Sequence, residues 1–314
     1  MNRRTHLKML GTIGLMSPIQ QLVCASNEAT NNIGFNIHLF SKHLQWLDYK
    51  DMSEAAKQMG FDGLDLTVRR KGHVLPENVE RDLPKAVAAM QKAGLQAEMM
   101  STNITNIQDP TTEKILKTAS ELGITCYRMG WLKYKDGQPI AEQIESFKPQ
   151  LKELEQMNEH YNIRGDYQNH AGTSVGSPVW DIWMLIKDLN PDWIGCQYDI
   201  RHAMVEGLNS WEVGLKLLQS HIRSLDLKDF VYIQKDNKWT VKNVPIGEGA
   251  VDFQKYFELL KKLNITAPIS IHAEYDLGGA EHGAKTLPTI PVEQIIATLK
   301  QDLTRLKDFI AQTN

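Results

Sequence analysis

The stretch Met59-Gly60-Phe61-Asp62-Gly63-Leu64-Asp65-Leu66-Thr67-Val68 places a helix-ending glycine directly before a β-rich run. Residues 51–59, which precede Gly60, carry apolar side chains at helical spacing and predict a helix that ends at this glycine. The same transition recurs at Leu122-Gly123-Ile124-Thr125. The chain therefore repeats a unit of helix, glycine or asparagine, and strand.

Eight such β-rich runs alternate with helical patterns. The predicted strands are 33–38, 63–68, 95–100, 124–129, 163–168, 194–199, 222–227 and 268–274. The predicted helices are 51–59, 83–92, 112–122, 144–161, 177–189, 211–220, 252–263 and 292–312. Eight strand–helix units spaced by roughly 30 residues favour an α/β fold of one closed parallel barrel, a single (β/α)8 TIM barrel over 26–314. A doubly wound sheet is the alternative, but 35–40 lacks the glycine-rich phosphate turn expected after its first strand.

The first 25 residues are expected to form an export signal rather than part of the barrel. Arg3, Arg4 and Lys8 precede a short apolar stretch, and the adjacent arginines are typical of a twin-arginine signal. Cys24 leaves a lipid anchor open, although the bulky Val23 before it favours cleavage after Ala25. We therefore expect a periplasmic or otherwise exported protein.

Composition and charge exclude several classes of protein. With 42% hydrophobic and 23% charged residues, the chain is neither disordered nor a disulfide scaffold. Removal of 1–25, which contains three basic residues and no acidic one, would change the net charge from −3 to −6. An acidic surface argues against nucleic-acid binding, and no remaining run is long and apolar enough for a membrane span.

In a TIM barrel the chemistry lies at the C-terminal ends of the strands. Candidate substrate-binding residues at those ends are Asn36, His38, Glu98, Arg128, Trp131 and Arg201. The last four strands end with oxygen and nitrogen ligands: Gln168 and His170, Asp199 and His202, Asp226 and Lys228, and His272 and Glu274. Carboxylate, amide and imidazole ligands together predict one divalent ion, such as Mn²⁺, Mg²⁺, Zn²⁺ or Co²⁺, as cofactor.

Four motifs carry a resemblance to a known family. They are Gln168-Asn169-His170-Ala171-Gly172, Asp199-Ile200-Arg201-His202, Leu225-Asp226-Leu227-Lys228-Asp229 and Pro245-Ile246-Gly247-Glu248-Gly249-Ala250-Val251-Asp252. Together they resemble the xylose isomerase-like TIM barrel superfamily of sugar phosphate isomerases and epimerases. The resemblance implies that Gln168, Asp199, Asp226 and either His272 or Glu274 hold the metal. It also implies that His202 contacts the substrate and that Lys228 is the family's strand-7 lysine. Because sugar phosphates are scarce outside the cytoplasm, the resemblance and the export signal together imply an unphosphorylated sugar or glycoside as the small-molecule partner.

Two departures from the family pattern affect the expected mechanism. The family usually has Glu at the position of Gln168 and His at that of Asp226, and an amide cannot accept a proton at neutral pH. A base that removes a proton α to a sugar carbonyl therefore has to be found elsewhere. Glu274 is the first choice, followed by His170, His202 and Glu98.

The enediolate so formed leads to isomerisation, epimerisation or loss of a β-substituent. Some exported relatives resemble lyases that act on 3-keto-glycosides, and both the export signal and Gln168 agree with that outcome. A secreted sugar-binding protein without catalysis is a further alternative, and an apurinic-site nuclease is disfavoured by the acidic charge. The sequence leaves open a homo-oligomer and an upstream sugar oxidoreductase as partners.

Overall fold

The computed structural model describes residues 34–313 of the 314-residue chain. The predicted export signal at 1–25 and the alternative anchor Cys24 lie outside the described residues. Within the described part, no helix is long and apolar enough to cross a membrane.

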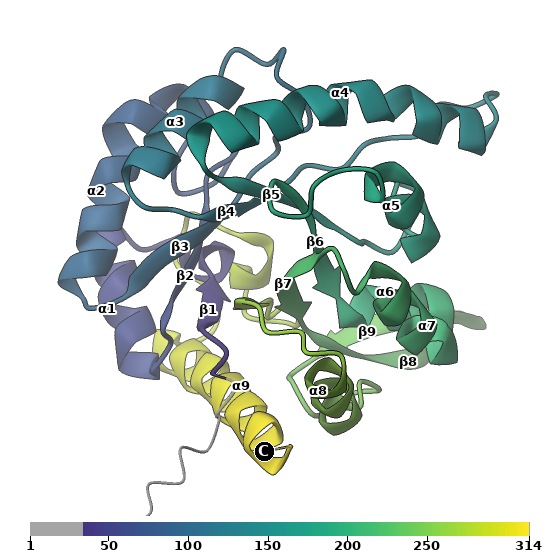
Figure 1. Ribbon diagram of the computed structural model, residues 1–314. Helices are drawn as coiled ribbons and strands as arrows, with labels where there is room; N and C mark the ends of the chain where they lie inside the picture. The colour runs from purple at the N-terminus through teal and green to yellow at the C-terminus, as the bar shows by residue number, and fades with distance from the viewer. Residues whose placement is uncertain (1–33, 314) are drawn as a thin grey trace, which may run out of the picture. The chain divides into compact units, whose positions relative to one another are not determined.

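Eight parallel strands close into a barrel in the order β1-β10-β7-β6-β5-β4-β3-β2 (Figure 1). The single (β/α)8 barrel expected from the repeating unit is thereby confirmed. The strands of the barrel are β1 Ile37–Phe40, β2 Gly63–Thr67, β3 Gln96–Ser101, β4 Cys126–Arg128, β5 Arg164–Gln168, β6 Ile194–Asp199, β7 Ile222–Leu227 and β10 Ile269–Ile271.

Helices surround the barrel, and most of them follow the predicted pattern (Figure 1). They are α1 Tyr49–Met59, α2 Val79–Lys92, α3 Thr112–Glu121, α4 Ile140–Tyr161, α5 Val179–Ile186, α6 Ile200–Gly207, α7 Trp211–Leu218, α8 Phe253–Lys262 and α9 Val292–Gln312. Short 3-10 turns are η1 Ser41–Leu44, η2 Pro76–Asn78, η3 Leu208–Ser210 and η4 Ala280–His282. As expected, α1 ends at Gly60, whose φ of 94° lets its N–H bond back to the carbonyls of Ala56 and Lys57.

The first strand lies further along the chain than predicted. Residues 33–38 were expected to be extended, whereas β1 spans Ile37–Phe40 and continues directly into η1. The shift has a packing cause, because Leu39 is fully buried in the hydrophobic core and the Phe40 ring stacks on His272 at 4.1 Å. The C-terminal end of this strand is therefore Phe40, not His38.

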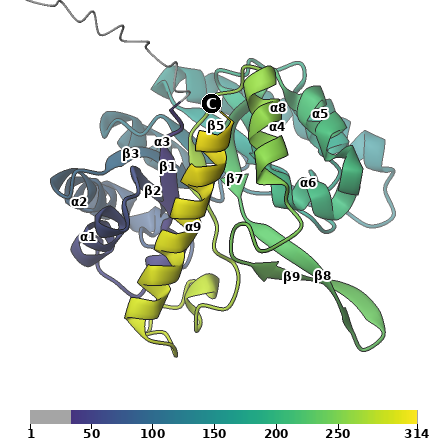
Figure 2. The same ribbon diagram turned by 90° about the horizontal axis from the view of Figure 1, so that it is seen from below.

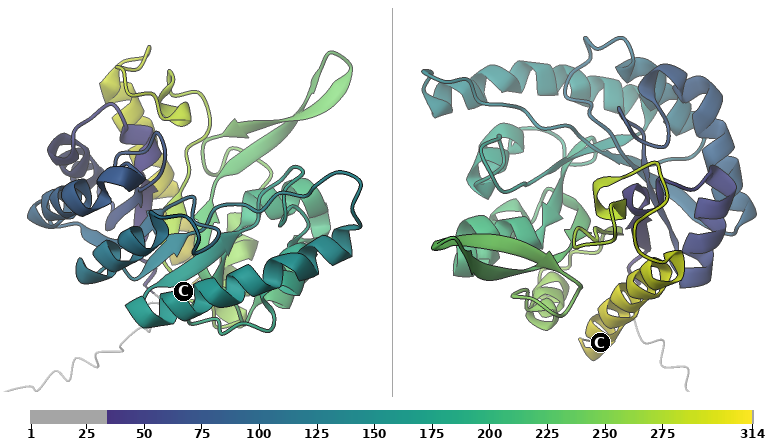
Figure 3. Two further views of the ribbon diagram at one scale, coloured as in Figure 1. Left: turned by 90° about the horizontal axis from the view of Figure 1, so that it is seen from above. Right: turned by 180° about the vertical axis from the view of Figure 1, so that it is seen from behind.

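A two-stranded hairpin interrupts the repeating pattern after β7. Its strands, β8 Asp229–Lys235 and β9 Lys238–Val244, pair antiparallel through seven residues. Asp236 and Asn237 form the two-residue turn with φ of 50° and 58°, the positive values that a tight hairpin turn requires. The hairpin projects away from the barrel in Figures 2 and 3. Neither the hairpin nor α6 was predicted from the sequence.

Alternate strand residues point into the barrel while their neighbours pack against the helices. Several of the inward-pointing side chains are polar and bind one another. In the lower part of the barrel, Arg164 binds Asp166 with Nε–Oδ1 at 2.8 Å, and Ser224 donates to Asp166 Oδ2 at 2.7 Å. Asp65 accepts hydrogen bonds from Ser101 at 3.0 Å and from Ser270 at 2.9 Å. The contacts of Asp166 define a lower polar cluster of Arg164, Asp166 and Ser224, beneath the C-terminal mouth of the barrel. Asp65, whose Oδ1 is buried without a hydrogen-bond partner, is not counted in it.

Candidate active site

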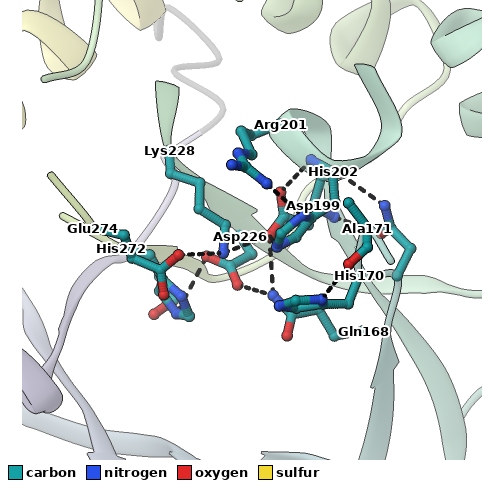
Figure 4. A network of polar contacts seen from close by, with 12 residues as sticks. Gln168, His170, Ala171, Asp199, Arg201, His202, Asp226, Lys228, His272 and Glu274 are labelled. Carbon is teal, nitrogen blue, oxygen red and sulfur yellow. Dashed lines mark hydrogen bonds and ion pairs between the residues drawn. The ribbon is translucent and has the colours of Figure 1, made fainter. Parts of the chain in front are cut away.

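The ends of β5, β6, β7 and β10 bring the predicted residues together at the C-terminal mouth (Figure 4). Gln168 and Asp199 are the last residues of β5 and β6, Asp226 lies in β7, and Lys228 and His272 directly follow β7 and β10. All five side chains are at most 2% exposed. We call Gln168, Asp199, Asp226, Lys228, His272 and Glu274 the mouth cluster.

Gln168 bridges the two aspartates of the cluster. Its Nε2 donates to Asp199 Oδ2 at 3.0 Å and also to Asp226 Oδ2. Its Oε1 accepts a hydrogen bond of 3.2 Å from Arg128 Nη1. Burial raises the pKa of the Asp226 carboxyl well above its usual value, although Lys228 opposes the shift.

Two lysines hold the carboxylate of Glu274. Lys42 Nζ lies 2.8 Å from Glu274 Oε1, and Lys228 Nζ lies 3.4 Å from Oε2 and 3.1 Å from Asp199 Oδ2. Burial alone would raise the pKa of Glu274, but Lys228 and Lys42 outweigh it and keep that pKa well below the usual value. Burial likewise would lower the pKa of Lys228, but Asp199 and Glu274 raise it above normal. At neutral pH both groups are therefore charged.

His272 lies close to Asp226 without forming a hydrogen bond to it. Its Nε2 lies 3.2 Å from Asp226 Oδ1 and 3.8 Å from Asp65 Oδ2, yet neither His272 Nε2 nor Asp226 Oδ1 has a hydrogen-bond partner. Burial, followed by Lys228, lowers the pKa of His272 well below 6.5, so its ring is neutral. A neutral imidazole and a buried carboxylate oxygen without partners are atoms that a ligand can use.

Asp199 both caps the N-terminus of α6 and belongs to the mouth cluster. Its Oδ1 accepts from the His202 backbone N–H at 2.9 Å and caps α6, while its Oδ2 faces Lys228 and Gln168. The first turn of α6 thus carries His202 back over the mouth, with Nε2 at 3.5 Å from Asp199 Oδ2. The sequence-based expectation that Asp199 and His202 share the mouth is borne out by this helical turn.

Hydrogen-bond partners fix the tautomers of the two mouth histidines. Arg201 Nη1 lies 2.9 Å from His202 Nδ1, and because a guanidinium can only donate, the proton of His202 is on Nε2. His170 Nδ1 lies 2.9 Å from the carbonyl of Ala171, which can only accept, so His170 carries its proton on Nδ1. His202 is therefore a donor toward the mouth, whereas His170 Nε2 has a lone pair available.

Aromatic and cationic side chains complete the wall beside β4 and β5. Trp131 donates its Nε1–H to the Gln168 carbonyl at 3.3 Å, and its ring meets the His170 ring edge-on at 4.8 Å. The Arg128 guanidinium lies 4.6 Å from the Trp131 ring centre. Burial lowers the pKa of His170, so this histidine is mostly neutral at pH 7.

The residue types of the mouth cluster fit a divalent cation. Asp199 and Asp226 supply carboxyl oxygens, His272 an imidazole and Gln168 an amide oxygen, the ligand classes that such ions accept. Among residues 34–313, however, no group of three or more His, Cys, Asp or Glu side chains is already arranged around one point. The Gln168 amide presents its nitrogen to both aspartates, so a metal would require that amide to turn its oxygen inward.

Three predicted substrate contacts lie at the wrong end of the barrel. Asn36 precedes β1, and His38 and Glu98 lie in the N-terminal halves of β1 and β3. They contact one another, with Glu98 Oε1 at 3.0 Å from Asn36 Nδ2 and at 3.1 Å from His38 Nε2. The assignment of Asn36, His38 and Glu98 to the substrate site, and of Glu98 as a base, is therefore wrong. The cause is the displaced start of β1 and the position of Glu98 three residues before the end of β3.

Three mouth residues were missed. Lys42 and His43 enter from η1, where Lys42 reaches Glu274 and His43 Nε2 accepts from the Ala273 backbone N–H at 2.9 Å. Asn243 enters from β9 and binds both Arg201 Nη2, at 2.8 Å, and the Glu274 carbonyl, at 3.2 Å. A strand ending at Phe40 in place of His38 would have identified Lys42, whereas no sequence signal marked Asn243.

The family motifs at 225–229 and 245–252 meet at Asp229. Asp229 accepts hydrogen bonds from the backbone N–H groups of Gly247, Gly249 and Val251 at 2.9–3.1 Å. A side chain at position 249 would lie 2.2 Å from Asp229 Oδ1, so only glycine fits there. The carboxylate thus fixes the loop that carries the chain from the hairpin to α8.

Comparison with known proteins agrees with this geometry. The family model described as xylose isomerase-like TIM barrel matches residues 53–290. The chain belongs to the xylose isomerase-like TIM barrel family. A Haemophilus influenzae protein, SgbU, which carries the name of an L-ribulose-5-phosphate 3-epimerase, is 35% identical over 85 residues, or 27% of this chain. The matched segment spans 29% of that protein's length.

Solved structures of this xylose isomerase-like fold resemble the chain over most of its length. The zinc-bound IolI protein has a TM-score of 0.68 at 16% identity and covers 89% of this chain and 99% of its own. The 3-keto-D-glucoside 4-epimerase YcjR from E. coli has a TM-score of 0.59 at 14% identity, covering 86% of this chain and 100% of its own. At such identities the structural likeness establishes the fold alone.

Proposed function

We propose that the protein is a divalent-metal-dependent enzyme of the sugar isomerase/epimerase type that removes a proton α to the carbonyl of an unphosphorylated sugar or glycoside. The observation that carries the proposal is the convergence of Asp199, Asp226 and His272 at one mouth, with unpartnered atoms on Asp226 and His272. Sugar epimerases among the similar proteins support the same class of reaction.

The metal site would use Asp199, Asp226, His272 and the oxygen of Gln168. When bound there, a divalent ion would polarise the substrate carbonyl and acidify the neighbouring C–H. Glu274 remains outside this set in the proposal, because a carboxylate bound to the ion would be a weaker base, and Lys42 and Lys228 hold Glu274 through its two oxygens. This choice makes His272, and not Glu274, the ligand from β10.

Two groups can accept protons on opposite sides of the mouth. Glu274 follows β10 and is ionised, while His170 follows β5 and has a free lone pair on Nε2 (Figure 4). Strands β6 and β7 lie between them in the barrel order. Glu274 would remove the proton from one face, and His170, after taking a proton from solvent on Nε2, would deliver it to the opposite face, the role that Gln168 cannot perform. His202 and Lys228 would donate hydrogen bonds to substrate oxygens.

A β-elimination is the second candidate, and Gln168 is the observation that favours it. If His170 delivers no proton to the opposite face, the enediolate can instead lose the substituent on the β-carbon, which leaves with a proton as the free alcohol. The substrate would then be a 3-keto-glycoside, and an upstream sugar oxidoreductase would have to supply its carbonyl. The predicted export signal and acidic charge support a neutral substrate outside the cytoplasm, in the periplasm or beyond it.

Incubation in D₂O tests the proposal. The protein is supplied with Mn²⁺, Co²⁺, Zn²⁺ or Mg²⁺ and with either D-fructose or a 3-keto-glucoside. Deuterium in an intact, rearranged sugar indicates isomerisation or epimerisation, and release of the aglycone indicates elimination. Absence of both with every metal would contradict the proposal, and saturable sugar binding that is indifferent to chelator would indicate a binding protein.

The His170→Gln variant separates the roles of the two bases. If Glu274 removes the first proton, the variant still exchanges deuterium into the starting sugar but forms no epimer. His282→Gln serves as the matched control, because the His282 side chain is 84% exposed and contacts the carboxylate of its neighbour Glu281 instead of the mouth cluster. Equal loss of exchange and epimerisation in His170→Gln would contradict the two-base arrangement.

A further inference from the structure

The hairpin β8–β9 turns one face toward the candidate active site. Directly paired residues lie on the same face, and Phe230 and Asn243 are the innermost pair on the face that is turned toward the site. Asn243 contacts Arg201 and the Glu274 carbonyl, and the Arg201 guanidinium lies 5.6 Å from the Phe230 ring centre. This face, called the inner face below, is therefore continuous with the mouth.

Aromatic residues continue along the inner face away from the barrel. The next pairs outward are Tyr232 with Val241 and Gln234 with Trp239. Tyr232 meets Phe230 edge-on at 5.2 Å, and it is 39% exposed, while Trp239 is 72% exposed. At about 3.4 Å per residue, Tyr232 lies one step of roughly 7 Å beyond the mouth and Trp239 about 14 Å beyond it.

The opposite face of the same hairpin has a different chemistry. Its pairs beyond Asp229 are Val231 with Lys242, Ile233 with Thr240 and Lys235 with Lys238. All three lysines of the hairpin therefore lie opposite the two exposed aromatic rings. Lysines keep a two-stranded hairpin soluble, whereas exposed Tyr and Trp side chains gathered on one face are typical of a binding surface.

We propose that the inner face binds a further sugar ring that is glycosidically linked to the sugar in the mouth. The inference rests on the proposed function for the reacting sugar and names its substrate as an oligosaccharide or longer glycoside. Tyr232 and Trp239 offer flat apolar surfaces to the C–H face of a sugar ring, and Gln234, Asn243 and the Tyr232 hydroxyl offer hydrogen bonds to its hydroxyls. Alternation of aromatic and amide groups suits a polyhydroxylated ring better than a purely apolar one.

Calorimetric titration of the full chain with glucose, cellotriose and maltotriose tests the proposal without requiring turnover. At least one trisaccharide should bind about three- to tenfold more tightly than glucose, as one or two ring contacts would give. Trp239→Ala and Tyr232→Ala should each remove most of that gain while leaving the glucose affinity unchanged. Trp239→Phe should retain part of it, and Thr240→Ala, on the opposite face, should retain all of it.

The remaining outcomes would overturn the proposal. One such outcome is that neither trisaccharide binds more tightly than glucose. Another is that the gain in affinity survives both alanine variants. A gain shown by 4-nitrophenyl glucoside but by neither trisaccharide would assign the face to an aromatic aglycone. Sedimentation that shows a dimer lost on Trp239→Ala would assign it to a second copy of the chain. Because binding is measured apart from deuterium exchange, a protein without exchange activity can still confirm the sugar-binding face, and an active enzyme can still lack it.

Discussion

The barrel interior contains two polar clusters, one above the other on the same strands. In the lower cluster, Arg164 and Ser224 satisfy both oxygens of Asp166. In the mouth cluster, two residues further along β5 and β7, Asp226 Oδ1 and His272 Nε2 are buried without hydrogen-bond partners. Both clusters combine buried acids with a cation, but only the mouth cluster retains unpaired atoms.

That difference separates structural from chemical use of buried charge. A buried acid whose oxygens are all bonded stabilises one arrangement of the strands. A buried atom without a partner costs free energy in the unliganded protein, and such costs concentrate at functional sites. The comparison therefore assigns stability to the lower cluster and chemistry to the mouth cluster, and variants of each can test it.

The largest effect is expected from Glu274→Gln. The amide cannot accept a proton, so kcat/KM for the exchange reaction should fall by about 10²- to 10⁴-fold. Rates of deuterium incorporation measure the loss, with Ser224→Ala in the lower cluster as the control that keeps full activity per folded molecule. Activity retained in Glu274→Gln would move the base to another residue.

Arg164→Met should affect stability rather than activity. Removal of one partner from a buried ion pair leaves Asp166 uncompensated, which typically costs about 3–5 kcal/mol of unfolding free energy. Urea unfolding measures this cost. Lys42→Met, its counterpart at the mouth, should cost less because Glu274 keeps Lys228 and is 25% exposed. An equal loss in both variants would remove the distinction between the clusters.

Asp302 on α9 is a third kind of buried acid for this comparison. It accepts hydrogen bonds, but no cation is bound to it. Its oxygens accept from the Tyr275 hydroxyl at 2.6 Å and the Ile246 N–H at 3.0 Å, and burial raises its pKa to about 7. Because the folded pKa exceeds the unfolded value of about 3.9, its stabilising contribution is complete below pH 4 and is lost as pH rises through 7.

Asp302→Asn should remove this pH dependence, since the amide keeps an acceptor for Ile246 and a donor for Tyr275. The difference in unfolding free energy between the variant and the original protein should change by up to about 4 kcal/mol between pH 4 and pH 8. Urea unfolding at both pH values measures it. A difference that is the same at both would show that folding does not raise the pKa of Asp302.

The smallest effect is expected from the metal alone. A divalent ion at 100 times its Kd should stabilise the folded protein by about 2.7 kcal/mol. Thermal unfolding with Mn²⁺ or with chelator measures this gain, which Asp226→Asn should abolish and Ser224→Ala should leave intact. A gain that persists in Asp226→Asn would place the ion away from the mouth cluster.

The sequence predicted the mouth cluster well because strand parity and strand ends are local properties. Gln168, Asp199, Asp226 and His272 each lie at the end of a strand whose β-rich run was clear, and alternate residues of such a run share a face. The fold followed from the regular repetition of the same unit. No long-range contact had to be known for either inference.

The errors came from features that depend on contacts between distant segments. The end of β1 is set by burial of Leu39 and by stacking of Phe40 on His272, which 33–40 alone does not reveal. That shift moved Asn36 and His38 out of the mouth and brought Lys42 into it. The hairpin has a turn of Asp236-Asn237, a weaker signal than Asn-Gly, and its inner face became visible only through Asn243.

The double use of Asp199 links the chemistry of the mouth to the backbone of α6. One oxygen holds the His202 amide and the other faces the cluster, so a ligand that draws the carboxylate inward changes the hydrogen bond that begins the helix. Hydrogen exchange at the His202 amide would then report whether the site is filled. Occupancy of a site deep in the barrel can in this way be followed from a single amide, with the catalytic residues left unaltered.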